Sequence, residues 1–164
     1  MNQTYMKEKK IFPLVMSMAL PMMLSMAFNS LYNIVDSYFV AKLSEDAMTA
    51  LSLVYPAQNL LTAVAVGFGV GVNAMISFYL GAQNQEKADK TATQGMELGV
   101  LHGVLLMILF LCGMNWFLGM FTKSDTVRAL GMEYSNVVFL FSTIVTGGIT
   151  LEKIFQAVGR MRAT

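Results

Sequence analysis

The chain has 164 residues, of which 55% are apolar and 13% charged, with a mean hydropathy of +0.57 and a net charge of +1. Soluble domains contain about a quarter charged residues, so this composition excludes a soluble enzyme, a secreted module and a disordered chain. The near-neutral charge provides no basic surface for nucleic acid. The single cysteine, Cys112, excludes a disulfide framework and a cysteine metal site, and one histidine cannot form a zinc cluster.

The charged residues are clustered and leave four long segments without Asp, Glu, Lys or Arg: 11–35, 47–85, 98–122 and 134–151. A helix needs roughly 20 residues to cross the ~30 Å hydrocarbon layer of a membrane. The sequence therefore predicts an all-α polytopic membrane protein with four transmembrane helices, at about residues 13–40, 53–80, 93–119 and 134–158.

Local signals mark the beginnings and the bends of these helices. Pro13 suits the first turn of the first span, whereas Pro21 lies deeper and is expected to kink it. Ser44 and Ser124 are expected to be N-caps, because each is followed at once by acidic residues that favour a helix start. In the fourth span the adjacent glycines at 147 and 148 favour a bend.

The distribution of lysine and arginine predicts the orientation. Four spans place both termini on one side, together with the loop at 81–92. That side carries eight of the eleven basic residues (positions 7, 9, 10, 87, 90, 153, 160 and 162), and the other side carries three (42, 123 and 128). The positive-inside rule therefore predicts cytoplasmic termini, in a multi-pass protein of the bacterial cytoplasmic (inner) membrane.

A polar stripe runs along one face of the first span, because its members are three or four residues apart: Ser25, Asn29, Asn33 and Asp36, flanked by Tyr32. Unpaired polar groups are costly in hydrocarbon, so this face is expected to line water or protein. Burial favours the protonated form of a carboxyl group and a nearby cation favours its ionised form, so Asp36 is a candidate binding group for H⁺ or Na⁺. The alternative is a wetted acid at the membrane interface, since Asp36 lies near the end of its span.

Small residues in the second and third spans indicate close helix contacts. Gly69, Asn73 and Ser77 are four apart and favour a packing ridge, with Asn73 also a candidate pocket-lining residue. Gly95, Gly99 and Gly103 form two overlapping GxxxG patterns typical of helix packing.

The remaining polar groups in the apolar segments favour structural roles. Glu97 and Glu152 are expected to be charges near the interface, and His102 favours a hydrogen-bonded packing role over a proton relay. The sequence contains no phosphate-binding GxxxxGK[ST] loop, no HExxH helix and no serine or cysteine nucleophile motif. We therefore expect no enzymatic activity and no cofactor, and energy from an ion gradient or a partner chain.

Several segments together resemble the N-terminal part of multidrug and toxic compound extrusion (MATE) transporters, and among them the bacterial MepA-like members. These segments are Leu20-Pro21 through Asn33-Ile34-Val35-Asp36, residues 46–53 with Pro56, Gly69-Val70-Gly71 to Gly81-Ala82 and Lys87-Ala88, and Phe155-Gln156-Ala157-Val158-Gly159-Arg160. Their order and spacing are more specific than any one of them, and they extend over nearly the whole chain.

The resemblance implies a function and a larger assembly. Such transporters have two six-helix lobes around a cavity and export cationic or amphipathic drugs in exchange for Na⁺ or H⁺. Asp36 matches the cation-coupling acid of the N-terminal lobe, and the chain is expected to be a fragment with four of twelve spans, needing the remainder of the transporter. Three alternatives stay open: a complete four-helix drug/proton antiporter that oligomerises, a non-transporting membrane assembly subunit, and a lipid-linked precursor flippase.

Overall fold

A computed structural model describes residues 10–159, apart from the side chain of Met18, and all regular elements in this range are helices. They are α2 (Ile11–Leu43), α3 (Glu45–Gly81), α4 (Gln85–Phe121), α5 (Asp125–Leu140) and α6 (Ser142–Ala157). Three of them, α2, α3 and α4, are long and apolar enough to cross a membrane, and α5 with α6 form a fourth if the bent pair counts as one span.

Side-chain caps fix the points where the helices begin. The Ser44 hydroxyl accepts a hydrogen bond from the Ala47 amide (3.0 Å), and Ser124 accepts one from the Val127 amide (3.4 Å), which confirms both predicted N-caps. The tight link between α3 and α4 uses Asn84, whose Oδ1 accepts from the Lys87 amide, while Gln83 adopts a left-handed backbone with φ of 58°. Short capped links of this kind force consecutive helices to run antiparallel.

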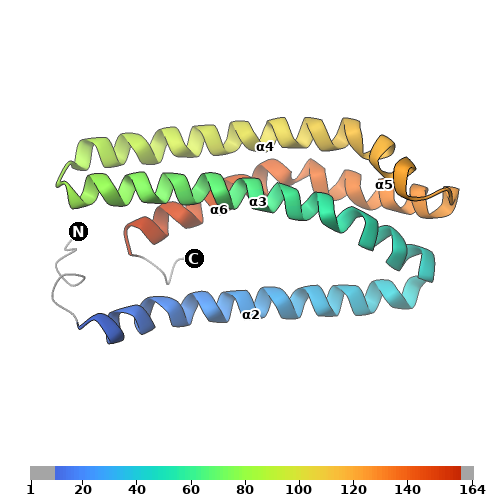
Figure 1. The fold of residues 1–164 in the computed structure, drawn as a ribbon, viewed down its shortest axis with the longest axis horizontal. Coiled ribbons are helices and arrows are strands. Elements are labelled where there is room, and N and C mark those ends of the chain that lie inside the picture. The colour runs from blue at the N-terminus through green and yellow to red at the C-terminus, as the bar shows by residue number, and fades with distance from the viewer. Residues whose placement is uncertain (1–9, 160–164) are drawn as a thin grey trace.

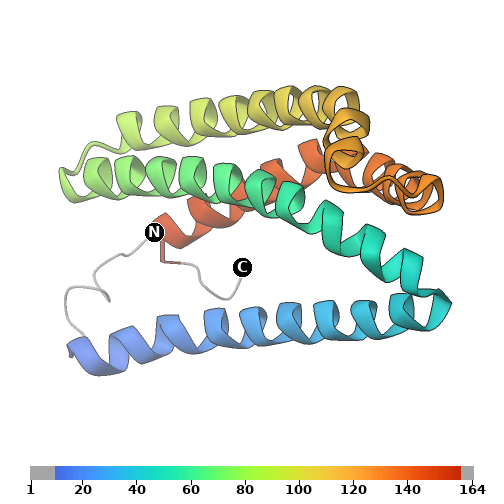
Figure 2. The same ribbon diagram turned by 45° about the vertical axis from the view of Figure 1, so that its right-hand side comes forward.

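Helices α3, α4, α5 and α6 pack into one bundle, and α2 lies along its side (Figure 1). The ribbons of α2 and α3 diverge from the link at Ser44, so they are far apart where α2 begins (Figure 2). The beginning of α2, the α3–α4 link and the end of α6 lie toward the same end of the molecule (Figures 1 and 2). No residue in the most apolar window of α2 is buried, and the helix continues through Pro21.

Helix α3 is longer than the span predicted within it. Its 37 residues extend about 55 Å at 1.5 Å per residue, so the helix is longer than the hydrocarbon layer is thick. Residues 45–52, which lie before the span predicted at 53–80, belong to the same continuous helix, which also includes Pro56.

The fourth predicted span is two helices rather than one. The axes of α5 and α6 differ by 45°, and the break lies at Phe141, whereas Gly147 and Gly148 are inside α6. Packing explains this position better than local propensity does. On one side of the break Phe139 stacks on Phe110 of α4, with ring centroids 4.5 Å apart, and on the other side the buried Ser142 hydroxyl donates to the Gly103 carbonyl (3.3 Å).

Two apolar clusters form the core of the bundle. The larger one joins α3, α4 and α5 through Val54, Leu61, Met114, Leu118 and Phe139, and the smaller one joins α3 to the start of α4 through Val72, Ile76 and Ala88. Between the two clusters, the buried residues of α4 are glycines. Because glycine has no side chain, α3 and α6 can pack close to α4 there.

The glycines of α4 lie where larger side chains of α3 and α6 come closest. A β-carbon added to Gly95 would lie 2.6 Å from Cγ1 of Val72, and one added to Gly99 would overlap Thr150. One added to Gly103 would overlap Thr146 and lie 2.7 Å from the Thr143 Cα atom. All three glycines are buried, so the predicted GxxxG face is the surface along which α4 meets its neighbours.

We predict that Gly103→Ala destabilises the bundle by about 1–3 kcal/mol, because its new methyl group meets backbone that cannot rotate away. Gly113→Ala, on the same helix with no atom within 4 Å of the added carbon, is the matched control and should be neutral or stabilise by up to about 1 kcal/mol. The measurement is the free energy of unfolding in mixed micelles followed by circular dichroism. Equal values for the two variants would contradict close packing at Gly103.

Candidate functional site

A cavity of about 530 Å³ separates α2 from α3 and α6. This size is within the 300–1,000 Å³ typical of sites for small organic ligands. Its walls combine apolar, hydroxyl, amide and charged side chains from the three helices: Met22, Ser25, Met26, Asn29 and Ser30 of α2, Thr62 and Val66 of α3, and Ile149, Glu152, Lys153 and Gln156 of α6.

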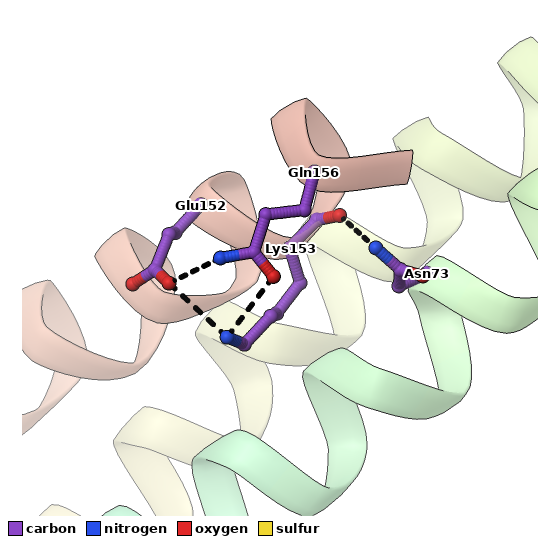
Figure 3. Close-up of polar contacts among 4 residues, drawn as sticks. All are labelled: Asn73, Glu152, Lys153 and Gln156. Atoms are coloured by element: carbon purple, nitrogen blue, oxygen red, sulfur yellow. Dashed lines mark hydrogen bonds and ion pairs between the residues drawn. The ribbon is translucent and has the colours of Figure 1, made fainter. Parts of the chain in front are cut away.

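The charged wall of this cavity is a hydrogen-bonded cluster on the last turns of α6 (Figure 3). The Lys153 ammonium donates to Oε1 of Glu152 (3.1 Å) and to Oε1 of Gln156 (3.2 Å). The Gln156 amide in turn donates to the same Glu152 oxygen, over 2.6 Å. The three side chains therefore form a closed ring of polar contacts in which the carboxylate is compensated by the ammonium.

Helix α3 holds Lys153 in this position through two residues one turn apart. The aliphatic part of Lys153 lies over Gly69, where an added β-carbon would be 2.8 Å from its Cγ atom. The Asn73 side-chain amide donates to the Lys153 carbonyl over 2.8 Å (Figure 3). The absence of a side chain at Gly69 thus makes room for the lysine, and Asn73 ties the two helices together at the same level.

The two charges of the pair differ in their accessibility. The Lys153 side chain is 13% exposed and the Glu152 side chain 39% exposed. Both hydrogen bonds to Glu152 end on Oε1, and no described residue between 10 and 159 donates to Oε2. The more accessible charge in the cavity is therefore the Glu152 carboxylate, whose Oε2 atom has no donor among the described residues.

The structure divides the predicted polar stripe of α2 between two places. Ser25 and Asn29 line the cavity. Asn33 donates to the carbonyl (2.9 Å) and to Oδ1 (3.0 Å) of Asn29, so these two amides satisfy each other along the exposed helix face. Tyr32 is exposed, and neither Tyr32 nor Asn33 lines the cavity.

Asp36 lies at the second place, nearer the link to α3. It is half-buried and is not among the residues that line the cavity. From Asn29 to Asp36 is seven residues, or about 10 Å along the helix axis. Tyr134 of α5 interacts electrostatically with both Asp36 and Tyr32, and its hydroxyl accepts a hydrogen bond from Gln58 of α3 (3.2 Å). Asp36 is therefore within electrostatic range of a polar group contributed by another helix.

The remaining polar residues in the apolar segments have packing roles or remain exposed. The His102 ring stacks on Phe68 with centroids 4.7 Å apart, and its Nδ1 lies 2.7 Å from the Leu98 carbonyl, which are the contacts of a packing residue. Glu97 is exposed on α4. Within residues 10–159 no three histidine, cysteine or acidic side chains are grouped as metal ligands.

Sequence reasoning missed the cluster at 152–156, although its residues were visible. From the sequence, Glu152 is predicted to be an interfacial charge, and Lys153 bears only on the predicted orientation. The informative signal was the spacing: Gln156 lies three and four residues after the two charges, on the same helix face. That face could be placed opposite Gly69 and Asn73 only once the helices were arranged in space.

Comparisons with known proteins give the family. The MatE family model matches residues 21–164. The multidrug export protein MepA of Staphylococcus aureus (strain NCTC 8325 / PS 47) is 27% identical over 156 residues, which cover 94% of this chain and 35% of MepA. This chain therefore spans about a third of the length of that curated relative.

Solved structures share the fold. A crystal structure of a MATE protein in complex with MaL6 superposes with a TM-score of 0.88 at 25% identity, covering 92% of this chain and 33% of that one. A multidrug resistance MATE family transporter of the MOP superfamily, in an outward-facing conformation, gives a TM-score of 0.87 at 25% identity with the same coverage. With apolar helices long enough to cross a bilayer and a family match over most of its residues, the chain belongs to the MatE family of multi-pass membrane transporters.

Proposed function

We propose that this chain forms part of the N-terminal lobe of an ion-coupled multidrug antiporter, which exports cationic or amphipathic xenobiotics in exchange for H⁺ or Na⁺. The observation that carries the proposal is the match to a multidrug export protein over 94% of the chain. The cavity between α2, α3 and α6 supports it, because apolar and methionine side chains there surround a small number of polar groups. Transport would need the part of the transporter that corresponds to the remaining two thirds of MepA.

Asp36 is the proposed binding group for the coupling ion. It is half-buried in an apolar helix, within electrostatic range of Tyr134 and three residues after the last amide of the stripe on α2. A carboxylate in such a position exchanges H⁺ or Na⁺ according to the side of the membrane to which it is open. Ion binding would then shift the equilibrium between positions of α2, with Pro21 as a weak point in that helix.

We predict that Asp36→Asn abolishes ion coupling. The test uses a chimera in which this chain replaces the matching segment of S. aureus MepA, expressed in cells loaded with ethidium. The amide cannot exchange a proton and binds Na⁺ weakly, so gradient-dependent efflux should fall about tenfold or more. A tenfold change corresponds to about 1.4 kcal/mol, which is within the usual range of about 1–3 kcal/mol for coupling free energies. Dissipating the proton gradient, or replacing Na⁺ by K⁺, identifies the ion.

Asp46→Asn is the matched control, because Asp46 is an exposed acid in the first turn of α3. Its efflux should equal that of the unmodified chimera. Unchanged efflux and unchanged ion dependence in Asp36→Asn would rule out the coupling role, and an inactive unmodified chimera at normal expression would argue against the transport function itself.

We further propose that the beginning of α2, the α3–α4 link and the end of α6 face the cytoplasm, where eight of the eleven lysines and arginines would lie. In a Cys112→Ala background, Leu43→Cys and Ala82→Cys place exposed thiols at opposite ends of α3. A membrane-impermeant maleimide should label position 43 in spheroplasts and position 82 only after permeabilisation. The reverse pattern would invert the orientation.

A further inference from the structure

We propose that the α6 cluster is a binding site for an organic monocation, in which the Lys153 ammonium occupies the place of the ligand while the cavity is empty. The cation would bind to the Glu152 carboxylate, and Lys153 would be displaced from it. The choice of ligand rests on the proposed export function, but the site is separate from Asp36, which does not line this cavity.

The geometry of the pair is unusual for a contact that only stabilises a helix. Residues at i and i+1 project about 100° apart, so an ion pair between Glu152 and Lys153 forms only if the lysine curls back toward the carboxylate. The lysine does so with its stem packed over Gly69 of α3. The stem is therefore anchored by another helix, while the ammonium lies at the cavity wall beside Glu152.

Accessibility favours a cation over an anion as the ligand. The ammonium already has two acceptors, Glu152 and Gln156, and its side chain is 13% exposed. The carboxylate is three times as exposed, at 39%, and its Oε2 atom accepts nothing from the described residues. An entering cation thus meets the more exposed side chain of the pair, whereas an entering anion meets an ammonium that is largely covered.

The rest of the cavity fits the body of an organic cation. Met22, Met26, Val66 and Ile149 provide apolar surface, and methionine adapts its shape to different ligands. Ser25 and Asn29 add polar atoms on the wall formed by α2. A volume of about 530 Å³ accommodates a drug-sized molecule.

Lys153 would weaken the binding of this ligand. Without ligand the site is neutral, so no uncompensated charge is held in the membrane. With a monocation bound, the site carries one net positive charge and the displaced ammonium repels the ligand. Gln156 remains 3.2 Å from the ammonium as an alternative acceptor, so Lys153 does not have to leave the cavity.

The test measures binding of radiolabelled tetraphenylphosphonium to the full 164-residue chain in lipid nanodiscs, with empty nanodiscs subtracted. Lys153→Met keeps the length of the side chain and removes its charge, and it should tighten binding about fivefold, the upper range for a partly exposed ion pair. Glu152→Gln should weaken binding about fivefold or more, and Lys153→Arg should bind like the unmodified chain. Lys90→Met and Glu97→Gln, exposed on α4, are matched controls and should change nothing.

A second measurement needs no substitution. Acetylation of Lys153 by a small amine reagent, quantified by mass spectrometry, should speed up when tetraphenylphosphonium is added, because the ammonium is displaced from Glu152. Acetylation of Lys90 should not change. Slower or unchanged acetylation of Lys153 would overturn the displacement, and weaker binding by Lys153→Met would overturn its role as a competitor.

The experiments distinguish failure of this binding site from failure of the proposed transport function. Binding of tetraphenylphosphonium to the chain tests the cavity, and efflux by the MepA chimera tests transport, so the two proposals have separate readouts. Efflux that fails in the MepA chimera while Glu152→Gln still weakens binding would remove the transport function and keep the site. Active efflux with no effect of Glu152→Gln or Lys153→Met on binding would support the transport function and overturn the cation site.

Discussion

The whole arrangement depends on helices approaching one another at positions without side chains. Lipid tails are as apolar as leucine, so burial of apolar surface does not drive helices together inside a membrane, and close packing must do so. Each important glycine receives a larger group from a neighbouring helix: Gly95 receives Val72, Gly99 receives Thr150, and Gly69 receives the stem of Lys153. These contacts determine how α6 lies between α3 and α4. Because α6 carries the charged cluster, the packing of glycines also places Glu152 and Lys153 at the cavity.

The features that could be predicted from the sequence are those set by neighbouring residues. Uncharged segments predicted an all-α membrane fold, and Ser44 and Ser124 were identified as caps by the acids that follow them. The break at Phe141 had no such local signal, since no proline or glycine lies there, and it results from Phe139 and Ser142 packing against different parts of α4. The cluster at 152–156 was missed for the same reason. A lysine near a helix end is usually an interfacial charge, and only the position of Gly69 across the interface identifies this one as held in the bundle.

Helix α2 connects the two polar regions of the structure. Ser25 and Asn29 face the cavity, Asp36 lies farther along the helix within electrostatic range of Tyr134, and the Asn33–Asn29 hydrogen bonds join the stripe between them. The most apolar window of α2 has no buried residue, and among the described helices α2 packs mainly against α3. A displacement of α2 would therefore change the wall of the cavity and the surroundings of Asp36 together, at little cost in core packing. Such an element, biased by an ion at one level and by a ligand at the other, is what coupling between two sites requires.

The internal pairing of Glu152 with Lys153 addresses a conflict that faces any transporter of cations. A lone carboxylate in the membrane would bind a cation strongly, but it would be costly to bury when empty and slow to release its ligand. A lysine fixed to the same helix turn compensates the charge in the empty state and competes at every moment for the carboxylate. Because the competitor is tethered, its effective concentration does not fall when the ligand concentration does. In the proposed site, affinity would thereby be reduced in favour of turnover, and the ammonium that neutralises the empty site would be the group that displaces the ligand.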